Sequence, residues 1–252
     1  VNSLKMRLPR VLELLAEHAP DVLCLQETKC EPAAFPDEEL AAAGYHAVHH
    51  SAGRWAGVAI VARRELELSD PVVGLAGELQ ADEARWIEAT VAGKRVASVY
   101  VPNGRAIGTP TFDEKLAFLD AMLARVQQLR DADDPLVVGG DFNVAPQDID
   151  VYDPAAFVGD THVTTDERGR LEALIAAGGL VDAYRALHPG EVQHTWWDYR
   201  QGHFHRGLGL RIDLVLASEV LAGTLVACGI ARDYRKGNKP SDHAPLIVEL
   251  EP

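Results

Sequence analysis

The stretch from Leu136 to Asn143 (Leu-Val-Val-Gly-Gly-Asp-Phe-Asn) constrains the fold of this chain more than any other. Its three apolar residues predict a short buried strand at residues 136–138, and the two glycines predict a tight turn after it. Side chains two residues apart on an extended backbone point the same way, so Asp141 and Asn143 should face one site. The glycines also remove bulk where a ligand would approach. Such a pair suits a phosphate or a metal-bound water, although Gly-Asp-x-Asn is also an ordinary turn composition.

The composition is that of a globular protein and excludes several other classes. The 252 residues are 47% apolar and 25% charged, and they contain no apolar run long enough to span a membrane. The net charge of −14 argues against indiscriminate binding of polyanions, so contacts with nucleic acid would need local basic patches. The three cysteines form no disulfide or metal pattern, which favours a reducing, cytoplasmic location.

Short apolar runs alternate with amphipathic helices, which predicts an α/β protein. Strands are expected at residues 22–25, 45–49, 58–62, 136–138, 209–216 and 246–250, with a hairpin formed by 85–91 and 95–101. Helices are expected before Pro20, at 36–43, from Thr111 to about Asp131 and around 170–177. No linker, repeat or low-complexity segment divides the sequence, so residues 1–252 are predicted to form a single domain.

Several of these strands end in polar residues. Glu27 follows the strand at 22–25, and a carboxylate there needs a positive partner, either Lys29 or a metal ion. Tyr100 and Asn103 lie at the end of the second hairpin strand, where Pro102 forces a loop. Because functional residues of layered α/β proteins gather at strand ends, these side chains are expected to share one site.

A second acid lies in an apolar strand near the end of the chain. Asp213 is surrounded by aliphatic residues and therefore needs a partner, for which His243 is the natural candidate. Trp196 and Trp197, taken alone, are typical of a core. His203 and His205 lack a second cluster of ligands, which disfavours a metal site there.

Six motifs occur in a fixed order along the chain: LQETK at 25–29, YVPNG at 100–104, GDFN at 140–143, WWDYR at 196–200, GLRIDL at 209–214 and PSDHAP at 240–245. Together they resemble the exonuclease III and AP endonuclease family of DNA-repair nucleases, within the endonuclease/exonuclease/phosphatase superfamily, over essentially the whole chain. The resemblance implies a four-layer α/β sandwich, with two mixed β-sheets packed face to face and flanked by helices. It also implies metal-dependent hydrolysis of DNA, with 3′–5′ exodeoxyribonuclease, abasic-site endonuclease and 3′-phosphatase or phosphodiesterase activity.

The resemblance also implies roles for individual residues. Asp141 matches the residue that orients or deprotonates the attacking water, and Asn143 matches the residue that holds this water. The implied catalytic residues are Tyr100, Asp141, Asn143, Asp213 and His243. The implied ligands of Mg²⁺, with Mn²⁺ as the alternative, are Asn2, Glu27, Asp141, Asn143, Asp242 and His243. The implied substrate-binding residues are Lys29, Arg85 and Asn103, together with Trp196, Leu210 and Ile212 around an apolar pocket for an abasic sugar.

The implied partner is double-stranded DNA with abasic sites or blocked 3′ ends, bound by a monomer in a bacterial-type cytoplasm, in association with the nucleoid. The basic clusters around Arg7 and Arg235 are expected to form a rim that faces DNA. Since the family opens with a further strand, a strand is expected before Val1.

Two alternatives stay open at this point. One is a superfamily relative that hydrolyses RNA or a phospholipid head group, which WWDYR and GLRIDL disfavour. The other is a catalytically silent DNA-binding relative, which the joint presence of Glu27, Asp141 and His243 disfavours.

Overall fold

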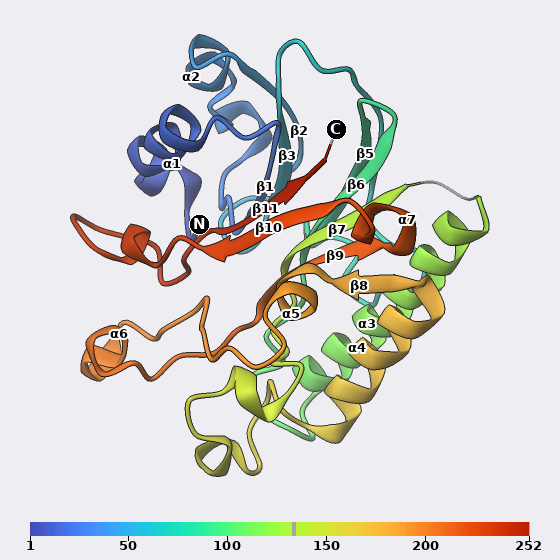
Figure 1. Ribbon diagram of the computed structural model, residues 1–252, viewed down its shortest axis with the longest axis vertical. Coiled ribbons are helices and arrows are strands. Elements are labelled where there is room, and N and C mark those ends of the chain that lie inside the picture. Colours follow the sequence, from blue (N-terminus) through green and yellow to red (C-terminus); the bar gives the residue numbers. More distant parts are fainter. Residues whose placement is uncertain (133–134, 252) are drawn as a thin grey trace.

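The computed structural model describes residues 1–132 and 135–251, whose strands lie in two sheet layers between helices (Figure 1). The first layer is a six-stranded sheet with the order β4-β5-β6-β7-β9-β8. Its strands are β4 (Leu68–Val73), β5 (Trp86–Val91), β6 (Lys94–Tyr100), β7 (Leu136–Asp141), β9 (Asp213–Ser218) and β8 (Leu180–Asp182). Because β6 and β7 are parallel and the other neighbours are antiparallel, the sheet is mixed.

The second layer consists of two antiparallel parts. One has the order β1-β3-β2, with β1 (Val22–Gln26), β3 (Val58–Arg63) and β2 (Tyr45–His50). The other pairs β10 (Leu225–Ile230) with β11 (Leu246–Leu250). The first part contacts the six-stranded sheet near the end of β6, where the side-chain amide of Gln26 donates to Ser98 Oγ at 3.0 Å.

Helices cover the outer faces of both layers (Figure 1). The second layer is covered by α1 (Leu4–His18) and the short α2 (Asp37–Ala42), and the six-stranded sheet by the long helices α3 (Pro110–Asp131) and α4 (Thr165–Gly178). Shorter helices are α5 (Ala183–Leu187), α6 (His203–Arg206) and α7 (Glu219–Ala222). Short 3₁₀ turns lie at Pro32–Ala34, Asp148–Asp150, Pro154–Phe157, Arg200–Gly202 and Arg232–Arg235. No helix among the residues described combines the length and apolar content needed to cross a bilayer.

The alternation of side chains along β3 separates the layers. Val58 and Ile60 pack with Ile87 of β5 in the core between the two sheets. Ala59 and Val61, on the opposite face of β3, pack in the core beneath α1 and α2. The predicted four-layer α/β sandwich is therefore confirmed, but among the described residues only the six-stranded sheet is mixed, and both parts of the second layer are antiparallel.

A cavity of about 300 Å³ separates the two parts of the second layer. It is lined by apolar residues of β1 and β11, such as Leu23 and Val248, and it reaches Asp141 and His243. Within the described part of the chain, β1 pairs only with β3, and β11 only with β10. That a strand precedes Val1 remains a prediction.

The sequence pattern missed three strands, β4, β8 and β10. β4 lies at an edge of the sheet, is largely exposed and contains Pro71, so it lacks both the apolar alternation and the composition of a strand. β8 spans three residues, too few for periodicity to be recognised. β10 exposes Val226 and lacks a regular alternation of buried and exposed residues.

Candidate active site

Three of the expected site residues lie side by side in the six-stranded sheet. Tyr100 at the end of β6 is in register with Asp141 at the end of β7, which is in register with Asp213 at the start of β9. Gly140 makes this arrangement possible, because its φ is +153° and a Cβ there would lie 2.0 Å from the carbonyl oxygen of Val99. The sheet therefore sets these functional groups on neighbouring strands at one of its ends.

Asn143 holds the carboxylate of Asp141 through both of its oxygens. The backbone N–H of Asn143 donates to Asp141 Oδ1 at 2.9 Å, and its side-chain Nδ2 donates to Oδ2 at 3.3 Å. The same Nδ2 donates to the carbonyl oxygen of Val101 at 2.9 Å. Asn143 adopts a left-handed φ of +51°, a strained conformation that Asn tolerates better than most residues. Both side chains are buried and fixed before any substrate arrives.

His243 lies between two carboxylates. Its Nδ1–H donates to Asp213 Oδ2 at 2.8 Å, and its Nε2 lies 3.8 Å from Asp141 Oδ2. Burial lowers the pKa of His243, but the charges of Asp213 and Asp141 outweigh it and raise the pKa to about 10. Burial raises the pKa of Asp141 to about 7 against the opposing charge of His243, and Asp213 and Glu27 add to the increase. The imidazole is thus held as a cation whose Nε2 faces the reacting end of the sheet.

A second polar group surrounds Glu27, which follows β1 and has a left-handed φ of +56°. The ammonium of Lys29 lies 2.5 Å from Glu27 Oε2 and donates to Asn2 Oδ1 at 2.8 Å. The side-chain amide of Asn2 in turn donates to Asp242 Oδ1 at 3.2 Å, and Trp196 Nε1 donates to Asp242 Oδ2 at 3.3 Å. Of the two partners expected for Glu27, the lysine is therefore present.

These residues also fit a divalent cation. One ligand atom each from Glu27, Asp141 and His243 lies within 4.8 Å of the others. As a cation His243 has no lone pair for a metal, so the oxygen donors of the group carry this fit. The carboxylates of Glu27 and Asp242 and the amide oxygen of Asn2 are the hard oxygen donors that Mg²⁺ prefers. A cation would also offset the negative charge that contributes to the raised pKa of Asp141.

The residues expected to bind substrate differ in how far they are exposed. Trp196 is half-buried, and its backbone forms isolated antiparallel β-bridges with Leu210 and with His243. Leu210 and Ile212 are 0% and 2% exposed and pack with Trp196, so they support it from beneath. Asn103 is exposed, and its Nδ2 donates to Asn143 Oδ1 at 3.3 Å.

Arg85 packs on the phenol ring of Tyr100. Its guanidinium lies 4.7 Å from the ring centroid and donates to the carbonyl oxygen of Tyr100 at 3.3 Å, and it also pairs with Glu83. Burial raises the pKa of Tyr100, with the charge of Glu27 as the next cause, so the phenol keeps its proton.

The expected basic rim, made of Lys5, Arg7, Arg10, Arg232, Arg235, Lys236 and Lys239, is wrong for Arg235 and stays a prediction for the other six. Arg235 is buried, and its guanidinium donates to the carbonyl oxygens of Ser241 and Trp197. Arg7 donates to Tyr199 Oη at 3.0 Å, and Arg10 pairs with Glu13 at 2.5 Å. Arg235 is thus turned inward onto backbone carbonyls that need donors, and Arg7 and Arg10, which are partly exposed, have partners within the protein.

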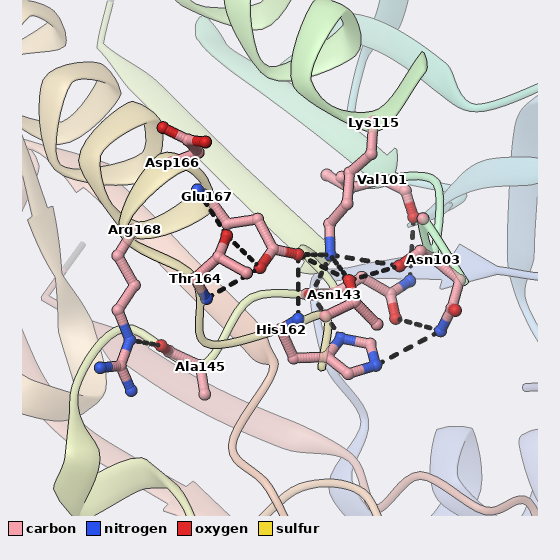
Figure 2. Close-up of polar contacts among 12 residues, drawn as sticks. Val101, Asn103, Lys115, Asn143, Ala145, His162, Thr164, Asp166, Glu167 and Arg168 are labelled. Carbon is pink, nitrogen blue, oxygen red and sulfur yellow. Dashed lines mark hydrogen bonds and ion pairs between the residues drawn. The ribbon is translucent and has the colours of Figure 1, made fainter. Parts of the chain in front are cut away.

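The sequence analysis missed a buried polar cluster behind Asn143, drawn in Figure 2. It joins Lys115 of α3, Thr161, His162 and Glu167 of α4. The one available signal was the Thr164-x-x-Glu167 pattern of a capping box, which predicts a helix start but not a partner for Glu167.

Trp55 is a second missed candidate. Its side chain is 73% exposed, and the guanidinium carbon of Arg54 lies 5.8 Å from its ring. The loop that carries it packs beside the Glu27 segment, since Lys29 N–H donates to the carbonyl oxygen of Ala56 at 2.9 Å.

Comparisons with known proteins agree with this geometry. The chain matches the model of the Endonuclease/Exonuclease/phosphatase family over residues 1–243. Exodeoxyribonuclease III of Haemophilus influenzae is 31% identical over 268 aligned residues, which cover 100% of this chain and 97% of that protein.

Two solved structures share the fold closely. A 3′ phosphatase from Neisseria, bound to a product DNA hairpin, gives a TM-score of 0.95 at 39% identity and covers 100% of this chain and 96% of its own. An AP endonuclease from Archaeoglobus fulgidus gives a TM-score of 0.95 at 38% identity, with the same coverage of 100% and 96%.

Proposed function

The chain belongs to the Endonuclease/Exonuclease/phosphatase family, and from this premise we propose that its site uses Mg²⁺ to hydrolyse DNA at 3′ ends and beside abasic sites. The protein is a DNA-repair nuclease of the exodeoxyribonuclease III and AP endonuclease class. The observation that carries the specific proposal is the alignment of Tyr100, Asp141 and Asp213 on three neighbouring strands, with His243 between the two acids.

Hydrolysis of a phosphate ester needs an oriented water, a neutralised phosphate and a proton donor near the developing charge. Asp141 orients the water and accepts its proton, and Asn143 keeps the Asp141 carboxylate in place through two hydrogen bonds. His243, held as a cation by Asp213, donates a hydrogen bond from Nε2 to a phosphate oxygen. Tyr100 offers a neutral phenol beside Asp141 for a further hydrogen bond.

The metal would be held by Glu27 and Asn2, with Asp242 hydrogen-bonded to Asn2. When bound, Mg²⁺ neutralises phosphate charge and polarises the ester; Mn²⁺, with similar oxygen preferences, can replace it. Lys29 already neutralises part of the charge of Glu27 and lies where a phosphate would approach.

The proposed substrates are duplex DNA with a blocked or recessed 3′ end and duplex DNA with an abasic site. The first is supported by the relative described as a 3′ phosphatase bound to a product DNA hairpin, the second by the one described as an AP endonuclease. Trp196 on its support of Leu210 and Ile212 offers an apolar surface for a sugar that lacks its base. We further propose that the protein acts as a monomer and works on the nucleoid of a bacterial-type cytoplasm.

The test uses labelled duplexes carrying a 3′ phosphate, a recessed 3′ end or one central abasic analogue, each incubated with Mg²⁺, Mn²⁺ or EDTA. We expect metal-dependent release of phosphate, shortening from the 3′ end and incision on the 5′ side of the lesion. If both 3′-end reactions proceed but the abasic duplex is not incised, only the abasic-site part of the proposal is contradicted.

Parallel incubations with an RNA strand and with a phosphoinositide address the related phosphodiesterases. Turnover of either in preference to every DNA substrate would contradict the assignment of DNA. Tight binding of DNA without any metal-dependent cleavage would instead indicate a silent relative.

A further inference from the structure

A buried ion pair lies directly behind the candidate site, between Lys115 of α3 and Glu167 of α4 (Figure 2). Both side chains are 0% exposed, although charged groups are rarely buried completely. Burying two charges is costly, and a well-packed apolar pair is often at least as stable. The pair therefore needs an explanation other than stability.

The ammonium of Lys115 holds the backbone of two loops of the site. It donates to the carbonyl oxygen of Asn143 at 2.7 Å and to that of Asn103 at 3.2 Å. One loop follows β7 and the other follows β6, so a single cation fixes the exits of two neighbouring strands. The same ammonium donates to Thr161 Oγ1 at 3.0 Å.

The carboxylate of Glu167 fixes a third segment against the same point. It accepts from Thr161 Oγ1 at 2.7 Å and from the backbone N–H of His162 at 2.9 Å. The ring of His162 then donates from Nδ1 to the carbonyl oxygen of Asn143 at 2.6 Å. Glu167 also accepts from Thr164, as the capping box that starts α4. The charged and polar groups of the cluster are therefore hydrogen-bonded to one another around the carbonyl oxygen of Asn143.

These contacts lead to the orientation of the catalytic acid. The carbonyl of Asn143 receives two donors, while its N–H and Nδ2 hold both oxygens of Asp141. The carbonyl, the N–H and the side chain of Asn143 are joined at its Cα, so a change in its backbone dihedrals would displace the donors that hold the Asp141 carboxylate. Small displacements of a reacting group cost large factors in rate. Without the ammonium, Asn143 in its left-handed conformation would lose one of the two donors that hold its carbonyl.

We propose that Lys115, paired with Glu167, is a positioning residue that fixes Asn143 and Asn103 and thereby aims Asp141 at the substrate. This inference rests on the proposed function of the same site. Because the side chain of Lys115 is 0% exposed, it acts through the carbonyls of the two loops.

Arg125 provides a matched control, because it also lies on α3 and also pairs with a fully buried carboxylate, that of Glu88. No residue of the expected site takes part in that pair. Lys115→Met and Arg125→Met each remove a cation from a buried acid; Glu167 loses its one ion-pair partner among the described residues, whereas Glu88 keeps Arg95 at 2.7 Å. Both variants should lower thermal stability, Arg125→Met by less. Only Lys115→Met should lower kcat, by about 10- to 100-fold, with the KM for DNA changed by less than about twofold.

Activity is measured with the 3′-phosphate duplex well below the melting temperature of every variant. A kcat of Lys115→Met equal to that of the wild type, or an equal loss of kcat in Arg125→Met, would overturn the inference. If Lys115→Met does not fold, Lys115→Gln, which retains amide donors, is judged by the same criterion with a smaller expected loss.

A second readout keeps the inference separate from the proposed function. The backbone amide resonances of Asp141 and Asn143 should shift in Lys115→Met and stay unchanged in Arg125→Met. If the wild type cleaves no DNA while these shifts occur, the proposed function fails and the positioning role stands. If these amide resonances are unchanged in Lys115→Met, the positioning role is contradicted, whichever substrate the enzyme cleaves.

Discussion

At the scale of single residues, Asp141 combines the properties of a reacting group. It is buried, its carboxylate is held at both oxygens by Asn143, and its pKa is raised by burial to about 7. A group with a pKa near the working pH is best able to exchange a proton during a reaction. Asp213 instead accepts a hydrogen bond from Nδ1 of His243 and thereby fixes the orientation of the ring.

Asp141→Asn should therefore lower kcat by about 10²- to 10⁴-fold, since the amide cannot accept the proton of the water. The shape of the side chain is retained, so binding of duplex DNA, measured by fluorescence anisotropy, should stay within about threefold of the wild type. The control is Asp120→Asn on α3, whose exposed carboxylate pairs with Arg170 of α4, and it should keep full activity. Parallel losses of cleavage and binding in Asp141→Asn would contradict a role confined to catalysis.

Trp55 illustrates a residue whose significance only exposure reveals. An aromatic ring that is 73% exposed beside Arg54, on the loop packed against the Glu27 segment, is placed to stack on a base of the substrate. Trp55→Ala should raise the KM for DNA about tenfold and leave kcat within about twofold, because stacking is worth roughly 1–3 kcal/mol per base.

The control for Trp55 is Val220→Ala, at another exposed apolar side chain, on α7. Because α7 follows Ser218, it lies at the end of β9 opposite Asp213. An increase in KM of the same size in Val220→Ala, or none in Trp55→Ala, would show that the Trp55 loop does not contact the substrate.

At the scale of elements, the start of α4 links helix stability to the site. Glu167 closes the capping box with Thr164 and pairs with Lys115. Burial alone would raise the pKa of Glu167, but the charge of Lys115 and the hydrogen bonds of Thr164 and Thr161 lower it to about 2 from 4.5. Because the folded pKa is depressed, the ionised form stabilises the folded state above pH 4.5, and this contribution is lost as the pH falls through about 2.

Urea unfolding of the wild type and of Glu167→Gln should reveal this dependence. The wild type should be more stable at pH 7, and the difference in free energy of unfolding should shrink steadily below about pH 4.5. Asp166→Asn, at the exposed neighbour in the same turn, should show no such narrowing. A difference between wild type and Glu167→Gln that is constant from pH 7 to pH 3 would refute the ion pair as its origin.

The sequence predicted elements well where the pattern was local. The strands at 58–62 and 246–250 and the helix from Thr111 to Asp131 agree with β3, β11 and α3 within a residue. The pattern failed for β4 and β10, because exposed strands held by their neighbours need no apolar alternation of their own.

At the scale of the whole molecule, the site forms where the two sheet layers meet. Glu27 comes from the end of β1 in one layer, and Tyr100, Asp141 and Asp213 come from the other. The chain as a whole carries a net charge of −14, and two of its arginines, Arg235 and Arg10, have partners within the protein.

The protein should therefore neutralise few phosphates when it binds DNA. We expect the logarithm of the affinity to fall with the logarithm of KCl concentration at a slope of less than about 4, since each neutralised phosphate contributes about 0.9. Anisotropy titrations of a duplex between low and physiological KCl measure this slope. A slope of about 6 or more would mean that an extended basic surface has been overlooked.

The sequence by itself determined which chemical groups stand at the strand ends and in what order, because apolar runs, glycines and prolines act over a few residues. It therefore predicted Glu27, Asp141 and His243 as parts of one site, and the structure brings these three together. Their individual roles remain predictions.

Only the tertiary structure decided which of the remaining charges are bound within the protein and which are free for a ligand. Lys115 pairs with Glu167, 52 residues away in the sequence, and the guanidinium of Arg235 points inward to the carbonyl oxygen of Ser241. The physical reason is that the free energy of a charge depends on the burial and the partners that distant segments supply. The register of strands far apart in the chain sets these partners, and no local pattern in the sequence contains that register.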